Sequence, residues 1–135
     1  MGQHRSPLAA AVDGMEVVDA HEHLWPESYH LAHEQDVLTL LQYSLADLEV
    51  AGASLAEIEA LRAHREGPQA PLDARWAIFR RYLPAIQDTA PIRALFRALR
   101  DIHDTDVLDD SNYVQVSEKI RALRRPGLYA SLLRE

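Results

Sequence analysis

Residues 15–23 read Met-Glu-Val-Val-Asp-Ala-His-Glu-His and carry the one convincing strand pattern in the sequence. Val17 and Val18 are β-branched, and a short apolar run that follows a glycine and ends in polar residues is typical of a buried strand. Leu24-Trp25-Pro26 follows directly, so the polar residues lie at the carboxyl end of the run. Barrels and open α/β sheets place their active sites at that end of their strands. The stretch therefore predicts a strand over 15–23 with a functional carboxyl end.

His21 and His23 are the candidate metal ligands of this strand. Side chains two residues apart on a strand point to the same face, about 6–7 Å apart, so the two imidazoles can bind one metal ion. Asp19 shares that face and can orient one of them through a hydrogen bond. An H-x-H pair without context is usually an ordinary polar pair at a strand end. The apolar strand before it and Asp19 beside it favour the ligand role here.

Helical patterns fill most of the remaining chain. Ser54 and Glu57 have the spacing of a capping box, and Gly52 is a helix stop just before them. Trp76 and Phe79, together with Tyr82 and Phe96, recur at helical spacing and indicate a core rather than a cofactor site. We expect helices that begin at Asp36 and Ser44, and further helices over 54–61, 72–83, 91–102, 111–123 and 128–133, with a loop at 66–71 and an acidic connector at 104–110.

One strand among helices cannot form a sheet, because its buried backbone groups need partners. The strand therefore pairs with another chain, or the sequence is one part of a larger α/β protein. The 135 residues, 47% of them hydrophobic, are enough to bury a core.

The sequence Val17-Val18-Asp19-Ala20-His21-Glu22-His23-Leu24 resembles the D-x-H-x-H end of the first barrel strand in the amidohydrolase superfamily, most of all in its amidohydrolase-related (amidohydrolase 2) group. In that family the two histidines bind the catalytic metal. The resemblance therefore implies that His21 and His23 hold a divalent cation, zinc or manganese, with Asp19 behind them. Residues 36–52 and 111–135 resemble the helical insertion after this strand and the helical run before the second barrel strand.

The fold class implied by the resemblance is α/β, as the amino-terminal fragment of a TIM (β/α)8 barrel. The fragment would hold the first strand plus a mostly helical insertion and would itself be mainly α. Residues 1–14 are expected to form a flexible amino terminus. Residues 15–135 are expected to form the partial barrel domain, with its helical region at 36–134.

The function implied is that of a metal-dependent hydrolase, which cleaves an amide, ester or lactone bond of a small-molecule substrate through a metal-activated water. A uronate-isomerase-like or decarboxylase-like member of the same superfamily is one alternative. A truncated, inactive helical fragment that binds a partner is another. The family's other site groups come from later strands, and a complete barrel takes about 250 residues. We therefore expect the 135-residue chain alone to bind metal weakly and to have no catalytic residues of its own.

Composition excludes several kinds of partner. A net charge of -7 argues against nucleic acid and anionic membranes, and the absence of cysteine argues against disulfides and thiolate metal sites. The apolar run Leu8–Val12 is too short for a signal peptide or a membrane span. We expect a soluble, cytoplasmic protein. The unpaired apolar stripes on its helices are compatible with a homo-oligomer.

His30 and His33 are a weaker candidate pair. They lie three residues apart beside Glu34, which is compatible with a metal or substrate contact on one helical face. A solvated connector is the alternative interpretation, and the spacing alone favours it.

Overall fold

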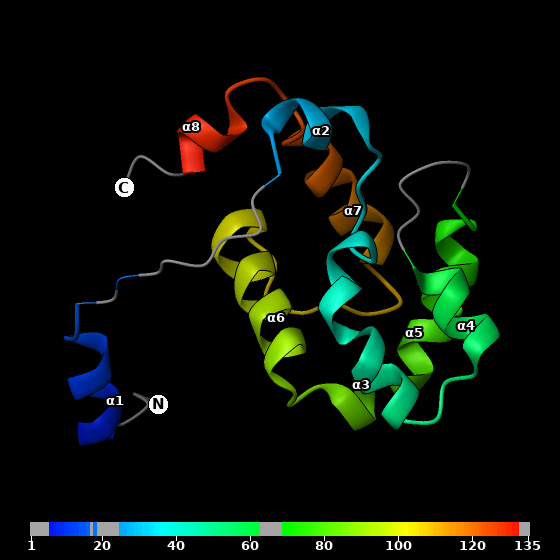
Figure 1. Cartoon of the computed structure of the whole chain (residues 1–135), viewed down its shortest axis with the longest axis horizontal. Coiled ribbons are helices and arrows are strands. Elements are labelled where there is room, and N and C mark those ends of the chain that lie inside the picture. The colour runs from blue at the N-terminus through cyan, green and yellow to red at the C-terminus, as the bar shows by residue number, and fades with distance from the viewer. Residues whose placement is uncertain (1–5, 17, 19–24, 63–68, 133–135) are drawn as a thin grey trace.

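The computed structural model describes residues 6–16, 18, 25–62 and 69–132, which fold mainly into helices (Figure 1). None of the residues in these ranges lies in a β-strand, so the prediction that the chain itself is mainly α is confirmed. In chain order the elements are α1 (Pro7–Asp13), α2 (Glu27–Ala32), the 3-10 helix η1 (Thr39–Ser44), α3 (Leu45–Val50), α4 (Leu55–Leu61), α5 (Leu72–Ile86), α6 (Ala90–His103), α7 (Tyr113–Ala122) and α8 (Leu128–Leu132).

The predicted strand over 15–23 is only partly covered by the structure. Met15, Glu16 and Val18 are described and are not in a strand, and the N–H of Met15 bonds instead to the carbonyl of Val12 at the end of α1. The other positions of the stretch lie outside the described residues. A strand needs a neighbouring strand to satisfy its backbone groups, and the described part of the chain supplies none.

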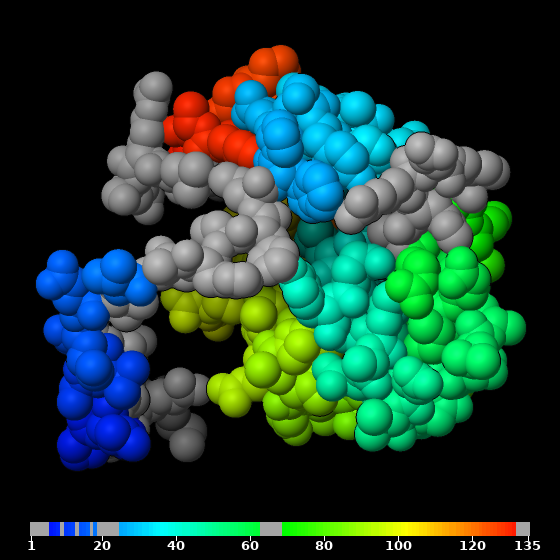
Figure 2. Space-filling model, in the orientation of Figure 1, coloured from blue at the N-terminus to red at the C-terminus, as the bar shows by residue number. Residues whose placement is uncertain are grey.

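The segment predicted as a flexible amino terminus, 1–14, contains the short helix α1, which the sequence patterns did not predict. Figures 1 and 2 show α1 to one side of the other helices. Leu8 and Val12 on this helix are exposed.

The other helices surround one apolar core. α6 packs along η1 and against α7, while α3, α4 and α5 pack on one another beside them (Figure 1). Trp76 and Phe79 of α5 are buried, and Tyr82 and Phe96 pack against the core from its edge, so the predicted core role of these aromatic residues is confirmed. The most deeply buried apolar side chains are Val37, Leu38, Leu41, Leu48, Leu61, Phe79, Ile92, Leu99 and Val116.

Local signals set the helix ends. Ser54 and Glu57 form the predicted capping box, since the Ser54 side chain accepts from the Glu57 N–H and the Glu57 carboxylate accepts from the Ser54 N–H. Gly52 ends α3 with a φ of 97°, a conformation that favours glycine. Pro91 lies in the first turn of α6, where a missing N–H leaves no helical bond unmade.

The helix predicted from Asp36 differs in its register. The helix begins at Thr39 rather than at Asp36, and residues 39–44 form a 3-10 helix. Val37 and Leu41 are buried, and so is Leu38, which directly precedes the 3-10 helix, whereas Leu40 is 37% exposed.

The Asp36 side chain bonds to the backbone of the turn that leads into η1, and it is also half of a buried ion pair. Its Oδ1 accepts the N–H groups of Leu38 and Thr39 at 2.9 and 3.0 Å. The guanidinium of Arg75, from the first turns of α5, donates to both carboxylate oxygens and to the carbonyl of Ala70. The pair joins the segment before η1 to α5, across 39 residues of sequence.

Among the helices that the structure describes, none has both the length and the apolar composition needed to cross a bilayer.

Candidate functional site

The predicted ligands His21 and His23, and the supporting Asp19, lie outside the described residues. The structure describes the chain again from Trp25, two residues after the motif. What it shows of the candidate site is therefore how the chain immediately after the motif is held.

Glu27 anchors this segment to the start of α8. Its carboxylate accepts the N–H of Gly127 at 3.2 Å and the N–H of Tyr129 at 3.0 Å. The first N–H groups of a helix have no partner within the helix, so an acidic side chain from elsewhere in the chain satisfies them well. These bonds, led by the one from Tyr129, hold the pKa of Glu27 below its usual range.

Two further hydrogen bonds join the same elements. The Tyr129 hydroxyl donates to the carbonyl of Trp25 at 2.9 Å, and the Arg124 guanidinium donates to the carbonyl of Leu31 at 2.8 Å. We call the hydrogen bonds from Arg124, Gly127 and Tyr129 to residues 25–31 the clasp. Figure 1 shows α2 and α8 next to each other at one end of the bundle. The helical unit, by which we mean α2 to α8, therefore has its first and last helices next to each other.

His30 and His33 both make hydrogen bonds or ring contacts with neighbouring residues. The Gln35 amide donates to His30 Nδ1 at 3.2 Å, while the His33 ring stacks on Tyr29 at 3.9 Å and its Nδ1 bonds to the Tyr29 carbonyl at 2.7 Å. Burial, and then the charge of Arg124, lower the pKa of His30. These contacts pack the two histidines onto α2 and its surroundings.

The described residues contain no group of side chains with metal-ligand geometry. Among residues 6–16, 18, 25–62 and 69–132, no three histidine, aspartate or glutamate side chains gather as a metal site requires. A catalytic zinc site takes three protein ligands and an open position. The described helices therefore do not supply a complete set of metal ligands. His30 and His33 with Glu34 do not form such a set either.

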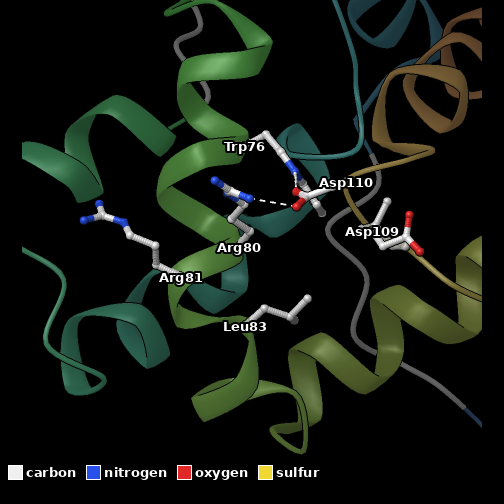
Figure 3. Close-up of a pocket in the computed structure, with 7 residues that line it drawn as sticks. Trp76, Arg80, Arg81, Leu83, Asp109 and Asp110 are labelled. Carbon is white, nitrogen blue, oxygen red and sulfur yellow. Dashed lines mark hydrogen bonds and ion pairs between the residues drawn. The ribbon is translucent and has the colours of Figure 1, made fainter.

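A depression of about 390 Å³ lies between α5 and the connector that leads to α7 (Figure 3). Trp76 and Arg80 of α5 converge on Asp110, whose two carboxylate oxygens accept the indole N–H and a guanidinium N–H at 2.7 Å each. Arg81 points to the other side of α5 in Figure 3 and pairs with Glu57.

The acidic side chains of this depression, Asp109 and Asp110, already accept hydrogen bonds from neighbouring residues. Asp109 accepts the N–H and hydroxyl of Ser111, and these bonds lower the pKa of Asp109. Trp76 stacks on Tyr113 with their rings 2° from parallel, and Leu83 lines another part of the wall. The arrangement fastens the acidic connector to α5 and offers no carboxylate held ready for proton transfer.

Comparison with protein-family models, with curated proteins and with solved structures finds no match in any of the three. Any assignment of a function to this chain therefore depends on its own residues.

The clasp and the Asp36–Arg75 pair are among the polar arrangements that the sequence patterns did not predict. Both join residues 39 or more positions apart, and no local motif identifies such partners. The helices predicted over 111–123 and 128–133 correctly placed the break before α8, but they gave no indication that Glu27 would bond to the start of that helix.

Proposed function

We propose that this chain is the amino-terminal part of a metal-dependent hydrolase of the amidohydrolase superfamily, acting on an amide, ester or lactone bond. The observation that carries the proposal is the sequence Asp19-Ala20-His21-Glu22-His23, which resembles the metal-binding end of the family's first barrel strand. In the proposed enzyme His21 and His23 hold a divalent cation, zinc or manganese, and Asp19 orients one imidazole.

The clasp supports the barrel origin of the helical unit. An insertion between a barrel strand and the element after it must leave the barrel and return to it at nearly the same place. Trp25 and Tyr129 lie side by side, with the Tyr129 hydroxyl 2.9 Å from the Trp25 carbonyl oxygen. Adjacent ends of this kind are what allow a folded unit to be inserted into a loop of another domain.

The chemistry divides between the cation and the chain. A bound divalent cation supplies an acidified water and an electrophile for the substrate carbonyl. His21 and His23 bind the cation through neutral imidazole nitrogens, so their occupancy falls as the imidazoles protonate at acidic pH. The remaining ligands and the proton-transfer group are those that the family takes from later strands.

Metal content tests the ligand assignment directly. Tag-free protein purified in the presence of zinc or manganese is analysed by elemental mass spectrometry, alongside the His21→Ala and His23→Ala variants. We expect substoichiometric metal in the unchanged chain and a loss of most of it in either variant, because two ligands bind weakly and one binds more weakly still.

The double variant His30→Ala/His33→Ala is the matched control, because it removes two histidines three residues apart from the next candidate site. It should retain the metal. Less than about a tenth of an equivalent, unchanged by His21→Ala, would remove the basis of the assignment, since even an incomplete site retains some zinc. The coding sequence after the codon for Glu135 gives a second test, because an open frame with further histidines and a late aspartate is expected.

A further inference from the structure

An apolar groove runs between η1 and α6. Leu40 and Tyr43 form one wall, and Ala90, Ala94 and Ala98 form the other, in a space of about 560 Å³. The three alanines are four residues apart and lie on one face of α6, where small side chains let another helix approach closely. Tyr43 is 73% exposed, so the groove is open to an occupant.

Arginines border this groove. A second depression, which shares Ala94 with the groove, is lined by Arg93, Arg97 and Arg100 and by one acidic residue, Asp106. Arg97 and Arg100 pair with Asp101. An occupant that carries apolar and acidic side chains together would match both features.

The amino-terminal arm, residues 7–16, has this composition. Leu8, Val12 and Met15 are spaced to lie on one side of a helix, and all three are more than half exposed. The charged residues of the arm are Asp13 and Glu16, and it contains no lysine or arginine.

The arm's helix also lacks extensive packing in the structure. α1 has seven residues and takes part in none of the extensive contacts between the described helices. A helix this short is marginal in water without a surface to pack on. Figure 2 shows α1 standing away from the bundle of its own chain, so the arm is placed to meet a neighbouring molecule.

We propose that the groove between η1 and α6 binds the amino-terminal arm of a second copy of this chain, and that two copies exchange arms reciprocally. Exchange about a two-fold axis closes the assembly and makes the same contact twice, which a single short arm needs to approach the area of a stable interface. A direct face-to-face dimer through α6 would instead oppose the arginines of one copy with those of the other. The proposal does not depend on the metal or on the proposed function.

Sedimentation equilibrium over a wide concentration range tests the exchange. We expect a reversible dimer whose dissociation constant rises about tenfold or more when the arm is changed by Leu8→Lys/Val12→Lys, or the groove is filled by Ala94→Trp. Ala56→Trp, at an exposed alanine of α4, is the matched control and should leave the dimer unchanged. Circular dichroism of each variant verifies that the helices remain folded.

Charge reversal tests whether the arm and the groove recognise each other. Arg93→Glu/Arg97→Glu should weaken the dimer, and adding Asp13→Arg/Glu16→Arg to the same chain should restore it. An unchanged chain that is monomeric at every concentration overturns the proposal, and this includes a monomer whose arm docks on its own groove. A dimer that neither the arm nor the groove variant weakens, or one that the second charge reversal does not restore, overturns it as well.

Discussion

Asp36 and Arg75 show how one pair of residues fixes the position of two elements. Their side chains are 7% and 4% exposed, whereas the other ion pairs of the described chain each include a side chain at least 42% exposed. Asp36 also accepts hydrogen bonds from the backbone N–H groups of Leu38 and Thr39, so both of its carboxylate oxygens are hydrogen-bonded. A buried ion pair with complete hydrogen bonding tolerates the loss of both charges better than the loss of one.

Replacing Asp36 with asparagine should therefore destabilise the protein strongly. The asparagine would keep one oxygen for the backbone cap but would direct an amide N–H at the Arg75 guanidinium, which is left as an unpaired buried charge. We expect the free energy of unfolding to fall by about 3–5 kcal/mol, measured by urea denaturation at neutral pH.

The companion variants separate charge from packing. Adding Arg75→Met to Asp36→Asn should recover a large part of the loss, because the buried charge is gone and methionine fills the space of the arginine stem. Arg80→Met removes an exposed arginine from the same helix and should change the stability by less than about 1 kcal/mol. If Asp36→Asn costs no more than Arg80→Met, the ion pair is not buried in solution as the structure has it.

At the scale of the element, α4 shows what local sequence can specify. The capping box of Ser54 and Glu57 was predicted from spacing alone and is confirmed. The predicted pattern did not include Arg81 and Tyr82 of α5, which both donate to the same Glu57 carboxylate and so join α4 to α5. One carboxylate thus starts a helix and attaches it to its neighbour.

Glu57 should make the stability of the protein depend on pH in a defined range. The bonds from Ser54, and then those from Arg81 and Tyr82, lower the pKa of Glu57 from 4.5 to about 2. A group with a lowered folded-state pKa contributes its stability above the unfolded value and loses it as the pH falls toward the folded value. Glu57→Gln should therefore be less stable than the unchanged protein at neutral pH, and this difference should shrink as the pH falls from about 4.5 toward 2.

Urea midpoints measured across this pH range by tryptophan fluorescence give the comparison. Glutamine still accepts from the Ser54 N–H, so the variant isolates the charge rather than the cap. Glu59→Gln on the same helix, whose carboxylate pairs with the exposed Arg62, is the control for a general change in net charge. A stability difference between Glu57→Gln and the unchanged protein that stays constant with pH would contradict the proposed role of the carboxylate.

The helices were predictable to the extent that their signals are local. Caps, glycine stops and apolar spacing act within a few residues, so the helices around Ser54, Trp76 and Leu95 were expected close to where they occur. The register of η1 was not, because the choice between a 3-10 helix and an α-helix there depends on packing against α6. The strand prediction failed at Met15, Glu16 and Val18 for a related reason, since strands are stabilised by partners distant in sequence.

For the molecule as a whole, the sequence predicted a site but not what surrounds it. His21 and His23 were identified by a two-residue spacing, and they remain a prediction. The bonds that attach the chain after them to α8 link Glu27 with Gly127 and Tyr129, 100 and 102 residues further on. Pairing at this distance follows from the path of the whole chain, so no motif could have predicted it.

The clasp should hold α8 without stabilising the core. Glu27→Ala removes the acceptor of two N–H groups at the start of α8, while the core around Phe79 and Leu99 makes no use of Glu27. We expect the amides of Gly127 and Tyr129 to exchange with deuterium on the order of tenfold faster, as when a charge-assisted hydrogen bond is lost. Amides in α5 and α6 should exchange at the same rate as before.

Lowering the pH should likewise reduce the protection of the Gly127 and Tyr129 amides in the unchanged protein, measured against their intrinsic exchange rates at each pH. Because these hydrogen bonds lower the pKa of Glu27, the clasp is complete above the ordinary glutamate value of 4.5 and weakens as the pH falls below it. Glu34→Ala removes an exposed carboxylate seven residues along the same segment and should leave α8 unchanged. Exchange that accelerates across α5 and α6 together with α8 would mean that the clasp is part of the cooperative core. The contact between α2 and α8 could then not open independently of that core.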